Sequence, residues 1–220
     1  MTLEELLKTY PTLYHMAEDG SWVSIERFGL LSTIALLDLF EIYGEDRDKL
    51  LSEHRPDSVT IRHPDHGVAV IRDQKPMTEN RLAHCLMDGI TPRKWYELIN
   101  QRVFFWLSEE RLLRLLSARA YRGRAHTVLH IHTRPLVEAY ADSIELTPIN
   151  SGNTLPVGRS RGRDTFRTIA DYPFDAMCRT RKAQDAVAEL SVLYGVPNIR
   201  DFVTRVERRQ ANSLLNTLVP

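Results

Sequence analysis

Apolar and polar residues alternate along the chain with two periods, one typical of helices and one typical of strands. The first residues predict a helix, because Thr2 and Glu5 can form a capping box and leucines follow at helical spacing until Pro11. Cap residues and helical spacing predict further helices over residues 21–29, 33–44, 78–89, 91–99 and 108–119. Aromatic and β-branched runs predict strands over residues 13–16, 67–72, 102–107, 127–132, 143–147 and 186–193.

Two stretches show no clear period, and the end of the chain shows a helical one. Residues 47–66 are polar, and residues 150–163 are rich in Gly, Ser, Asn and Arg, so both are predicted to be loops. After a turn at residues 195–197, a helix is predicted from Asn198, with one apolar face formed by Ile199, Phe202, Val203 and Val206. The last regular segment is therefore expected over residues 186–207.

The composition supports a single α+β domain over residues 1–220. With 220 residues, of which 43% are apolar, the chain can fill one hydrophobic core. Its 29 basic and 29 acidic side chains cancel, so no overall field attracts nucleic acid or an anionic membrane. Binding of that kind would require a local patch.

Cysteine usage and hydropathy favour a cytoplasmic protein that does not associate with membranes. Cys85 and Cys178 lie far apart and form no CxxC pair, as is typical of a reduced compartment. No charged and then apolar leader opens the chain. No apolar run approaches the ~20 residues that a membrane span needs.

Three histidines are the first candidates for chemistry, because the common catalytic signatures are absent from the sequence. It contains no phosphate loop, no GxSxG elbow, no HExxH and no GxGxxG after a strand. His126, His130 and His132 share one face of a predicted strand, in the HxH spacing that metal sites use. They either ligate a metal ion or form the solvated face of that strand, and the second interpretation is the simpler one.

A basic stretch precedes the last predicted strand. Between Arg159 and Lys182, seven basic residues outnumber three acidic ones, and three aromatic residues lie among them: Phe166, Tyr172 and Phe174. Arginine and aromatic side chains together can hold phosphates and stack on bases. The stretch is therefore either a nucleic-acid contact or a solvated loop that its aromatic residues attach to the core.

Glu189 is unusual because it lies within AVAELSVLYGV, where its near neighbours are apolar or small. A carboxylate that faces inward from such a strand is rarely without a role. Strand alternation alone leaves two directions open, since the same side chain can also face solvent.

Four segments, in this order, resemble ADP-ribosyltransferases, and most closely the DarT-type enzymes that modify DNA bases. The first two are LYHMAEDGSWVSIERFGLLS at residues 13–32 and VIRDQKP at residues 70–76. The others are RVFFWLSEERL at residues 102–112 and RKAQDAVAELSVLYGVPNIRDFVTRV at residues 181–206. The chain departs from the family where Ala17 replaces a hydroxyl residue after the histidine, and where a polar insertion precedes Arg72.

The resemblance implies a fold and a co-substrate. The expected fold is a split β-sheet, mixed or antiparallel, with flanking helices, and the expected co-substrate is NAD. It implies catalytic roles for Glu189, as the carboxylate, and for Arg72, as a cation near the phosphates or the acceptor. It further implies that NAD is bound by Tyr14, His15, Ser32 and Phe105, with His15 on the adenosine ribose and Phe105 beside the nicotinamide.

The loop ahead of the last strand selects the acceptor in this superfamily. The resemblance therefore implies that nucleic acid contacts Asn150, Asn153, Thr154, Arg159, Arg161 and Arg163. The chemistry suits these residue types, because loss of nicotinamide leaves an oxocarbenium-like ribose that a buried carboxylate stabilises. No Glu-x-Glu pair occurs, which argues against modification of arginine in proteins.

The leading hypothesis is an NAD-dependent mono-ADP-ribosyltransferase that modifies a base of DNA or RNA. Such an enzyme would act as a toxin, held in check by an antitoxin protein that removes the mark. One alternative on the same fold is an RNA 2′-phosphotransferase, which requires more positive charge than Arg72 supplies. The others are a non-catalytic module that binds a nucleotide or a partner protein, and the histidine metal enzyme.

Overall fold

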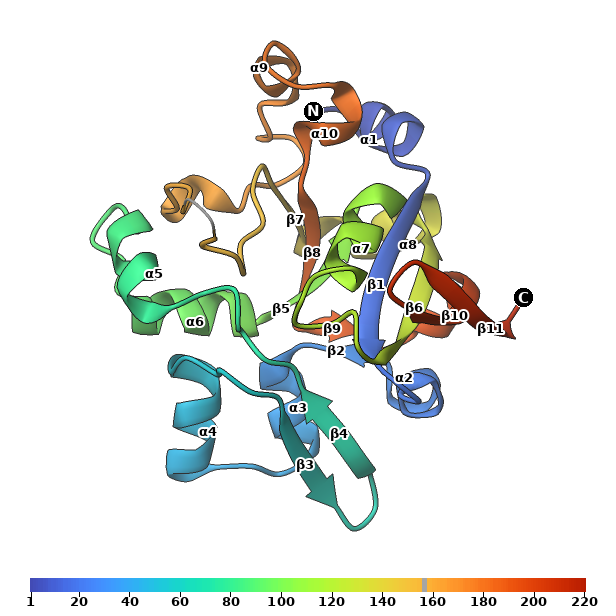
Figure 1. Ribbon diagram of the computed structural model, residues 1–220. Helices are drawn as coiled ribbons and strands as arrows, with labels where there is room; N and C mark the ends of the chain where they lie inside the picture. Colours follow the sequence, from blue (N-terminus) through green and yellow to red (C-terminus); the bar gives the residue numbers. More distant parts are fainter. Residues whose placement is uncertain (156–157) are drawn as a thin grey trace.

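One large antiparallel sheet organises the chain (Figure 1), as the computed structural model shows for residues 1–155 and 158–220. Its strands lie in the order β11-β10-β6-β1-β5-β8-β7, and each pairs antiparallel with its neighbours. This single α+β domain confirms the predicted class. The strands are β1 (Thr12–Glu18), β5 (Arg102–Trp106), β6 (Ala125–His132), β7 (Ile144–Thr147), β8 (Glu189–Leu193), β10 (Val203–Gln210) and β11 (Ser213–Val219).

Short helices surround the sheet, and several begin at the predicted caps. Thr2, Thr91 and Ser108 each accept a hydrogen bond from a backbone N–H in the first turn of their helix. In the described residues, no helix has the length and apolarity needed to cross a membrane. The helices around the sheet are α1 (Leu3–Thr9), α2 (Trp22–Phe28), α5 (Glu79–Cys85), α6 (Pro92–Asn100), α7 (Glu109–Leu116), α8 (Thr133–Tyr140), α9 (Phe174–Cys178) and α10 (Ala183–Ala186), with 3-10 turns at Ala141–Ser143, Arg163–Thr165 and Ile199–Asp201.

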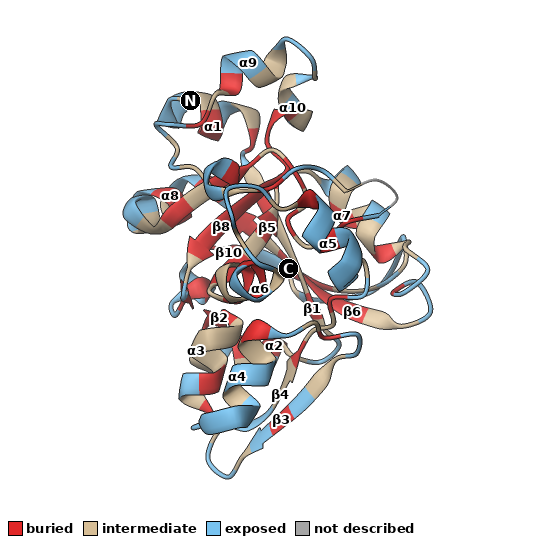
Figure 2. Ribbon diagram, turned by 90° about the vertical axis from the view of Figure 1, so that its left-hand side faces the viewer, coloured by how far each residue is buried: buried red, intermediate tan, exposed pale blue. Residues whose placement is uncertain are grey.

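The main core lies on one face of the sheet, where alternate residues of the central strands point the same way. Figure 2 shows much of β5, β8 and β10 in the colour of buried residues. The side chains that fill this core include Leu13, Phe105, Leu129, Ile131, Leu190, Val192 and Val206. The opposite face is covered by α7, whose Leu112 and Leu116 pack against Val128.

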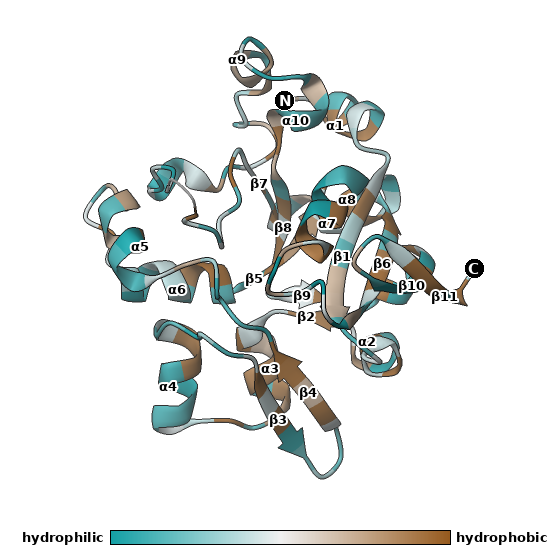
Figure 3. Cartoon of the chain, viewed as in Figure 1, coloured by the Kyte–Doolittle hydropathy of each residue, from teal (hydrophilic) through white to brown (hydrophobic). Residues whose placement is uncertain are grey.

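A small lobe stands beside the sheet at the position of the predicted polar loop, so that prediction was wrong. It contains α3 (Thr33–Leu39), α4 (Gly44–Ser52) and a hairpin of β3 (Val59–His63) and β4 (Gly67–Ile71). The lobe has its own core of Leu37, Phe40, Ile61 and Ile71. Figure 3 shows α3 and β4 as apolar, whereas α4 is mostly polar, since only Ser52 of its residues is buried. The region was misread for that reason.

Gly44 and the C-terminal segment also differ from the predictions. Gly44 opens α4 instead of ending the preceding helix. Residues 203–210 form the strand β10, because they pair with β6 on one side and with β11 on the other. A helical spacing of apolar residues was outweighed there by the hydrogen bonds that two neighbouring strands supply. β11 extends the regular structure beyond the expected end at residue 207.

Gly29 fixes the connection between α2 and the sheet. A short pair of strands, β2 (Leu30–Leu31) and β9 (Gly195–Val196), joins this region to the end of β8. Gly29 has a φ of 88°, and a Cβ atom there would lie 2.4 Å from Pro197 Cα. We expect Gly29→Ala to lower the free energy of unfolding by about 2 kcal/mol, through strain and overlap with backbone.

Urea denaturation measures this loss, and Gly20→Ala is the matched control. Gly20 also has a positive φ, of 76°, but a Cβ atom there meets no neighbour. We expect Gly20→Ala to cost less, because only backbone strain remains. Equal losses in the two variants would contradict the close packing of Gly29 on Pro197.

Candidate active site

A cavity of about 590 Å³ lies where the sheet meets the small lobe. The structure pairs β1 with β5 at one position, Tyr14 opposite Trp106. Beyond it, residues 16–19 of β1 and its following turn line the cavity together with residues 102–104 of β5. The cavity is therefore located where two central strands separate, and its volume falls within the range of small-molecule sites.

Five of the predicted site residues line this cavity: His15, Ser32, Arg72, Asn150 and Glu189. They come from β1, the start of α3, the end of β4, the loop after β7 and the start of β8. Residues separated widely in sequence thus share one cavity.

Tyr14 and Phe105 are not in the cavity lining, so the structure does not support direct NAD contacts for them. Tyr14 lies on the opposite face of β1 from His15, because successive side chains of a strand alternate. It packs against the apolar side chains between α7 and the sheet. Phe105 is fully buried in the main core, with its ring 5.9 Å from that of His15. Phe104, its neighbour, lines the cavity instead.

The predicted acceptor residues beyond Asn150 lie outside the main cavity. Thr154 is buried and donates through N and Oγ1 to the carbonyl of Pro76, so its role is structural. Asn153 supports the loop through its side chain, which accepts from Leu155 N at 2.7 Å. Arg159 and Arg163 are exposed.

Arg161 is buried, whereas the predicted contact to nucleic acid requires an accessible guanidinium. Its guanidinium donates to Asn153 O at 2.9 Å and lies 5.6 Å from the centre of the Trp95 ring. It lines a separate cavity of about 290 Å³. Burial lowers the pKa of Arg161, and the nearby Cys85 and Glu189 oppose that shift.

His15 is held as a neutral imidazole at the edge of the cavity. Its Nδ1 lies 2.8 Å from the carbonyl oxygen of Phe104, and a carbonyl can only accept, so Nδ1 carries the proton. Burial, together with the positive charge of Arg72, lowers the pKa of His15 to about 4 in spite of this hydrogen bond. Nε2 of the neutral ring is then an acceptor for a ligand hydroxyl.

Glu189 faces inward, which decides between the two directions that the sequence left open. Only 4% of the residue is exposed, and its Oε2 accepts from Ser151 N at 3.0 Å. Burial raises the pKa of Glu189 to about 7, although hydrogen bonds from Ser151 and the charges of Arg111 and Arg161 lower it. Near neutral pH, Glu189 can therefore both carry charge and exchange a proton.

Arg72 brings a partly desolvated positive charge to the cavity. Its Nη1 lies 3.3 Å from Glu18 Oε2, and its guanidinium stands 5.3 Å from the centre of the Tyr121 ring. Nε and Nη1 are both buried, and within the described part of the chain neither makes a hydrogen bond, so the ion pair with Glu18 is the contact of Nη1. Burial lowers the pKa of Arg72, and Glu18 opposes this. Such a cation gains energy from an anionic ligand.

Arg55 is a cavity residue that the sequence did not reveal. It is buried, and its guanidinium donates to Asn100 Oδ1 at 3.0 Å, to Arg72 O at 3.2 Å and to the Leu50 carbonyl. Burial lowers its pKa to about 10. Through the bond to Asn100, Arg55 connects the lobe to α6 beside the cavity. Nothing in the polar stretch around it distinguishes Arg55 from a surface arginine.

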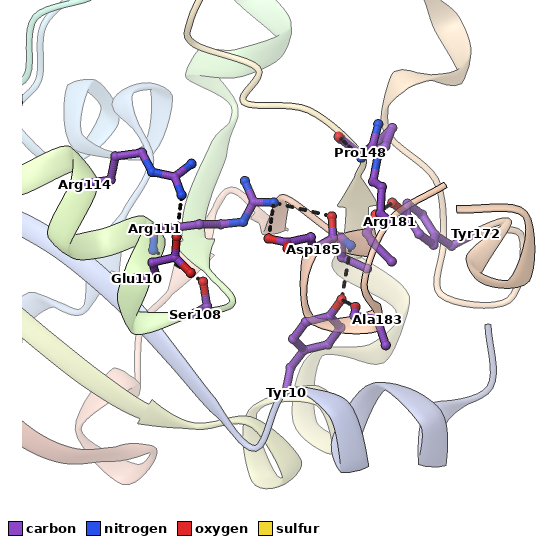
Figure 4. A network of polar contacts seen from close by, with 12 residues as sticks. Tyr10, Ser108, Glu110, Arg111, Arg114, Pro148, Tyr172, Arg181, Ala183 and Asp185 are labelled. Carbon is purple, nitrogen blue, oxygen red and sulfur yellow. Dashed lines mark hydrogen bonds and ion pairs between the residues drawn. The ribbon is translucent and has the colours of Figure 1, made fainter. Parts of the chain in front are cut away.

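The backbone ahead of Glu189 is fastened by three side chains, shown in Figure 4. The Tyr10 hydroxyl donates to Ala183 O and accepts from Val187 N, at 3.1 Å in the second case. The Tyr172 hydroxyl donates to Ala186 O at 2.6 Å. Arg111 lies 3.3 Å from Asp185 Oδ1. These contacts hold the start of β8, and so the position of the Glu189 side chain.

The histidines of β6 have other partners than a metal ion. His126 is buried, with Nε2 3.1 Å from Tyr121 O, and His130 Nε2 lies 3.0 Å from Glu207 Oε2. Over residues 1–155 and 158–220, no group of three or more His, Cys, Asp or Glu side chains has the geometry to hold a metal ion. Neither Nε2 is therefore oriented toward a shared ligand.

A family model described as a family of unknown function (DUF7002) matches residues 11–203. The chain belongs to this family. The part shared with DUF7002 includes β1, the small lobe and β8, and so all five cavity residues named above. No curated protein matches the chain. The roles of the cavity residues therefore stay predictions that rest on their chemistry.

Proposed function

We propose that this DUF7002 protein is an NAD-dependent mono-ADP-ribosyltransferase that modifies a base of DNA or RNA. The observation that carries the proposal is the meeting of His15, Ser32, Arg72 and Glu189 in one cavity of about 590 Å³. The resemblance to ADP-ribosyltransferases named this set in advance, with NAD as co-substrate. The split between β1 and β5 also agrees with the split sheet of an ADP-ribosyltransferase-like fold.

The residues present fit an anionic dinucleotide. Arg72 Nε, which has no partner among the described residues, offers a hydrogen bond to a phosphate, and Nη1 is ion-paired with Glu18. His15 Nε2 and the hydroxyl of Ser32 are suited to a ribose, since Nε2 accepts a hydrogen bond and the hydroxyl can both donate and accept one. When bound, NAD supplies a ribose carbon that loses nicotinamide through an oxocarbenium-like transition state.

Glu189 has two tasks in this proposal. Its carboxylate stabilises the positive charge that develops on the ribose, at short range and away from water. The same carboxylate then accepts the proton that the acceptor nitrogen or hydroxyl loses, which a pKa of about 7 permits. Ser151, which bonds to Oε2, fixes the carboxylate in orientation.

A nucleic-acid acceptor is supported by the loop that follows the cavity. Asn150 and Gly152 line the cavity, and Arg159 and Arg163, which follow in the sequence, are exposed. Exposed arginines are suited to phosphate contacts that position a strand without reading its sequence. A base-modifying enzyme of this kind would be toxic, and an antitoxin protein that removes the mark is the expected partner.

Incubation with NAD and single-stranded DNA or RNA tests the proposal. We expect release of nicotinamide and an adduct on the nucleic acid, detected by chromatography and mass spectrometry. NAD alone should raise the melting temperature, because a ligand that binds only the native state stabilises it. The absence of both nicotinamide release and a thermal shift would contradict the proposal.

One observation favours a second candidate, an RNA 2′-phosphotransferase. Such an enzyme needs more positive charge than Arg72 supplies, and Arg55 and Arg102 also line the cavity. Arg102, however, is paired with Glu145 at 2.7 Å, which reduces its charge toward a ligand. The product separates the two candidates: this one removes the 2′-phosphate of an RNA, whereas the first adds ADP-ribose to a base.

A further inference from the structure

The loop after β7 is held through both backbone groups of Ser151. The N–H of Ser151 donates to Glu189 Oε2, with N and Oε2 3.0 Å apart. Its carbonyl oxygen accepts from the indole N–H of Trp95, with Nε1 and O 3.3 Å apart. Trp95 is fully buried on α6 and is not part of the cavity lining. One loop residue therefore links the carboxylate of the cavity to a core residue that lies outside the cavity.

Arg161 holds the same loop at a second carbonyl group. Its Nη2 donates to Asn153 O at 2.9 Å, two residues beyond Ser151. Its guanidinium also lies 5.6 Å from the centre of the Trp95 ring. Phe166 stacks on that ring as well, with the two ring centres 5.7 Å apart and an angle of 25° between the planes. The indole that reaches Ser151 is therefore fixed by two neighbours in addition to its own helix.

Burial of Arg161 costs stability, and its charge acts on Glu189. Only 1% of Arg161 is exposed, and its Nε and Nη1 are buried without a hydrogen-bond partner among the described residues. A buried cation with few partners is unfavourable by itself. Arg161 and Glu189 are close enough for each to favour the charged form of the other. The groups that favour the carboxylate are thus Ser151, through its hydrogen bond, and two cations, Arg161 and Arg111 of α7.

We propose that Trp95 and Arg161 are positioning residues for Glu189. They hold the carbonyl groups of Ser151 and Asn153, and so keep the N–H of Ser151 directed at the carboxylate. A group that stabilises developing charge is effective only when it is oriented before the reaction. The inference rests on the proposed function in so far as Glu189 is the catalytic carboxylate. A positioning role, unlike a contact to nucleic acid, is compatible with a buried guanidinium.

Titration of the Glu189 carboxyl group, followed by carbon NMR without NAD, tests the inference. Glu189→Gln identifies the resonance. Trp95→Phe keeps an aromatic ring but removes the N–H that holds Ser151 O. We expect the pKa of Glu189 to rise above its native value of about 7, because the hydrogen bond from Ser151 to the charged form weakens. Arg161→Met should also raise this pKa, because a loop contact and a positive charge are both lost.

Trp22→Phe and Arg161→Lys are the matched controls. Trp22 is buried on α2 outside the cavity lining, and its indole N–H donates to no described residue. Trp22→Phe should therefore lower the stability without moving the titration of Glu189. Arg161→Lys keeps the positive charge, so its titration should lie closer to that of the native chain than the titration of Arg161→Met. A Trp95→Phe or Arg161→Met variant with native circular dichroism and a native Glu189 titration overturns the role of that residue.

Transfer from NAD supplies a second measurement. In Trp95→Phe and Arg161→Met we expect kcat to fall by about 10-fold or more while KM for NAD changes little, because the carboxylate is misplaced and the residues proposed to bind NAD are not. Trp22→Phe should keep the native kcat. A rise in KM with an unchanged kcat overturns the positioning role. A native chain that transfers nothing from NAD contradicts the proposed function alone, since the titration of Glu189 then still decides this inference.

Discussion

Glu189→Gln is expected to abolish transfer from NAD while leaving the fold intact. Glutamine has the shape of the glutamate, and its amide oxygen can still accept from Ser151 N, which lies 3.0 Å from Oε2. It supplies neither the negative charge nor the proton acceptor. We expect the rate of adduct formation to fall at least about 100-fold, the order of effect seen when one preorganised electrostatic group is lost.

Single-turnover kinetics with saturating NAD measure this loss. Glu53→Gln is the control, because Glu53 is exposed and lies outside the cavity lining, so the same chemical change there should leave the rate unchanged. The NAD-induced thermal shift should persist in Glu189→Gln, since His15 and Arg72 remain. An active Glu189→Gln would remove Glu189 from the mechanism, and a non-catalytic binding module would then explain the cavity better.

The same substitution is expected to stabilise the protein above neutral pH. The folded pKa of Glu189 is about 7, against an ordinary value of 4.5, so the native state holds the proton more tightly than the unfolded state. Stability is therefore lost as the pH rises from about 4.5 through 7, and the penalty is complete above that window. A shift of this size corresponds to about 3 kcal/mol.

Urea denaturation across that pH range tests this linkage. Glutamine does not titrate, so the difference in unfolding free energy between Glu189→Gln and the native chain should grow by about 3 kcal/mol from low to high pH. Glu53→Gln should show no such growth. A constant difference would mean that Glu189 ionises as easily in the fold as in water. Together with the loss of transfer, the gain would identify a site that sacrifices stability for chemistry.

Strong local signals in the sequence predicted the framework around the cavity. The capping box at Thr2, the caps at Thr91 and Ser108 and the aromatic strand at residues 102–107 are local features, and the structure confirms them. His15 and Glu189 were predicted by resemblance, and both line the cavity. Local patterns succeed in these places because caps and strand propensity act within a few residues.

Contacts between distant segments explain what the sequence could not show. The side of β1 on which Tyr14 lies depends on the register with β6 and β5, and that register put His15 in the cavity and Tyr14 against α7. Arg161 is buried because its guanidinium lies over the ring of Trp95, which belongs to the distant α6, and donates to Asn153 O of its own loop. Arg55 joins the site through Asn100 of α6. None of these partners has a signature in the sequence near the residue it holds.

A crystal structure of Glu189→Gln with NAD bound tests the central claim most directly, because the inactive variant preserves the co-substrate. We predict NAD in the cavity between the sheet and the small lobe, with the nicotinamide ribose beside residue 189, a ribose hydroxyl on His15 Nε2 and a phosphate on Arg72. NAD bound elsewhere, or a cavity that stays empty at saturating NAD, would contradict the account.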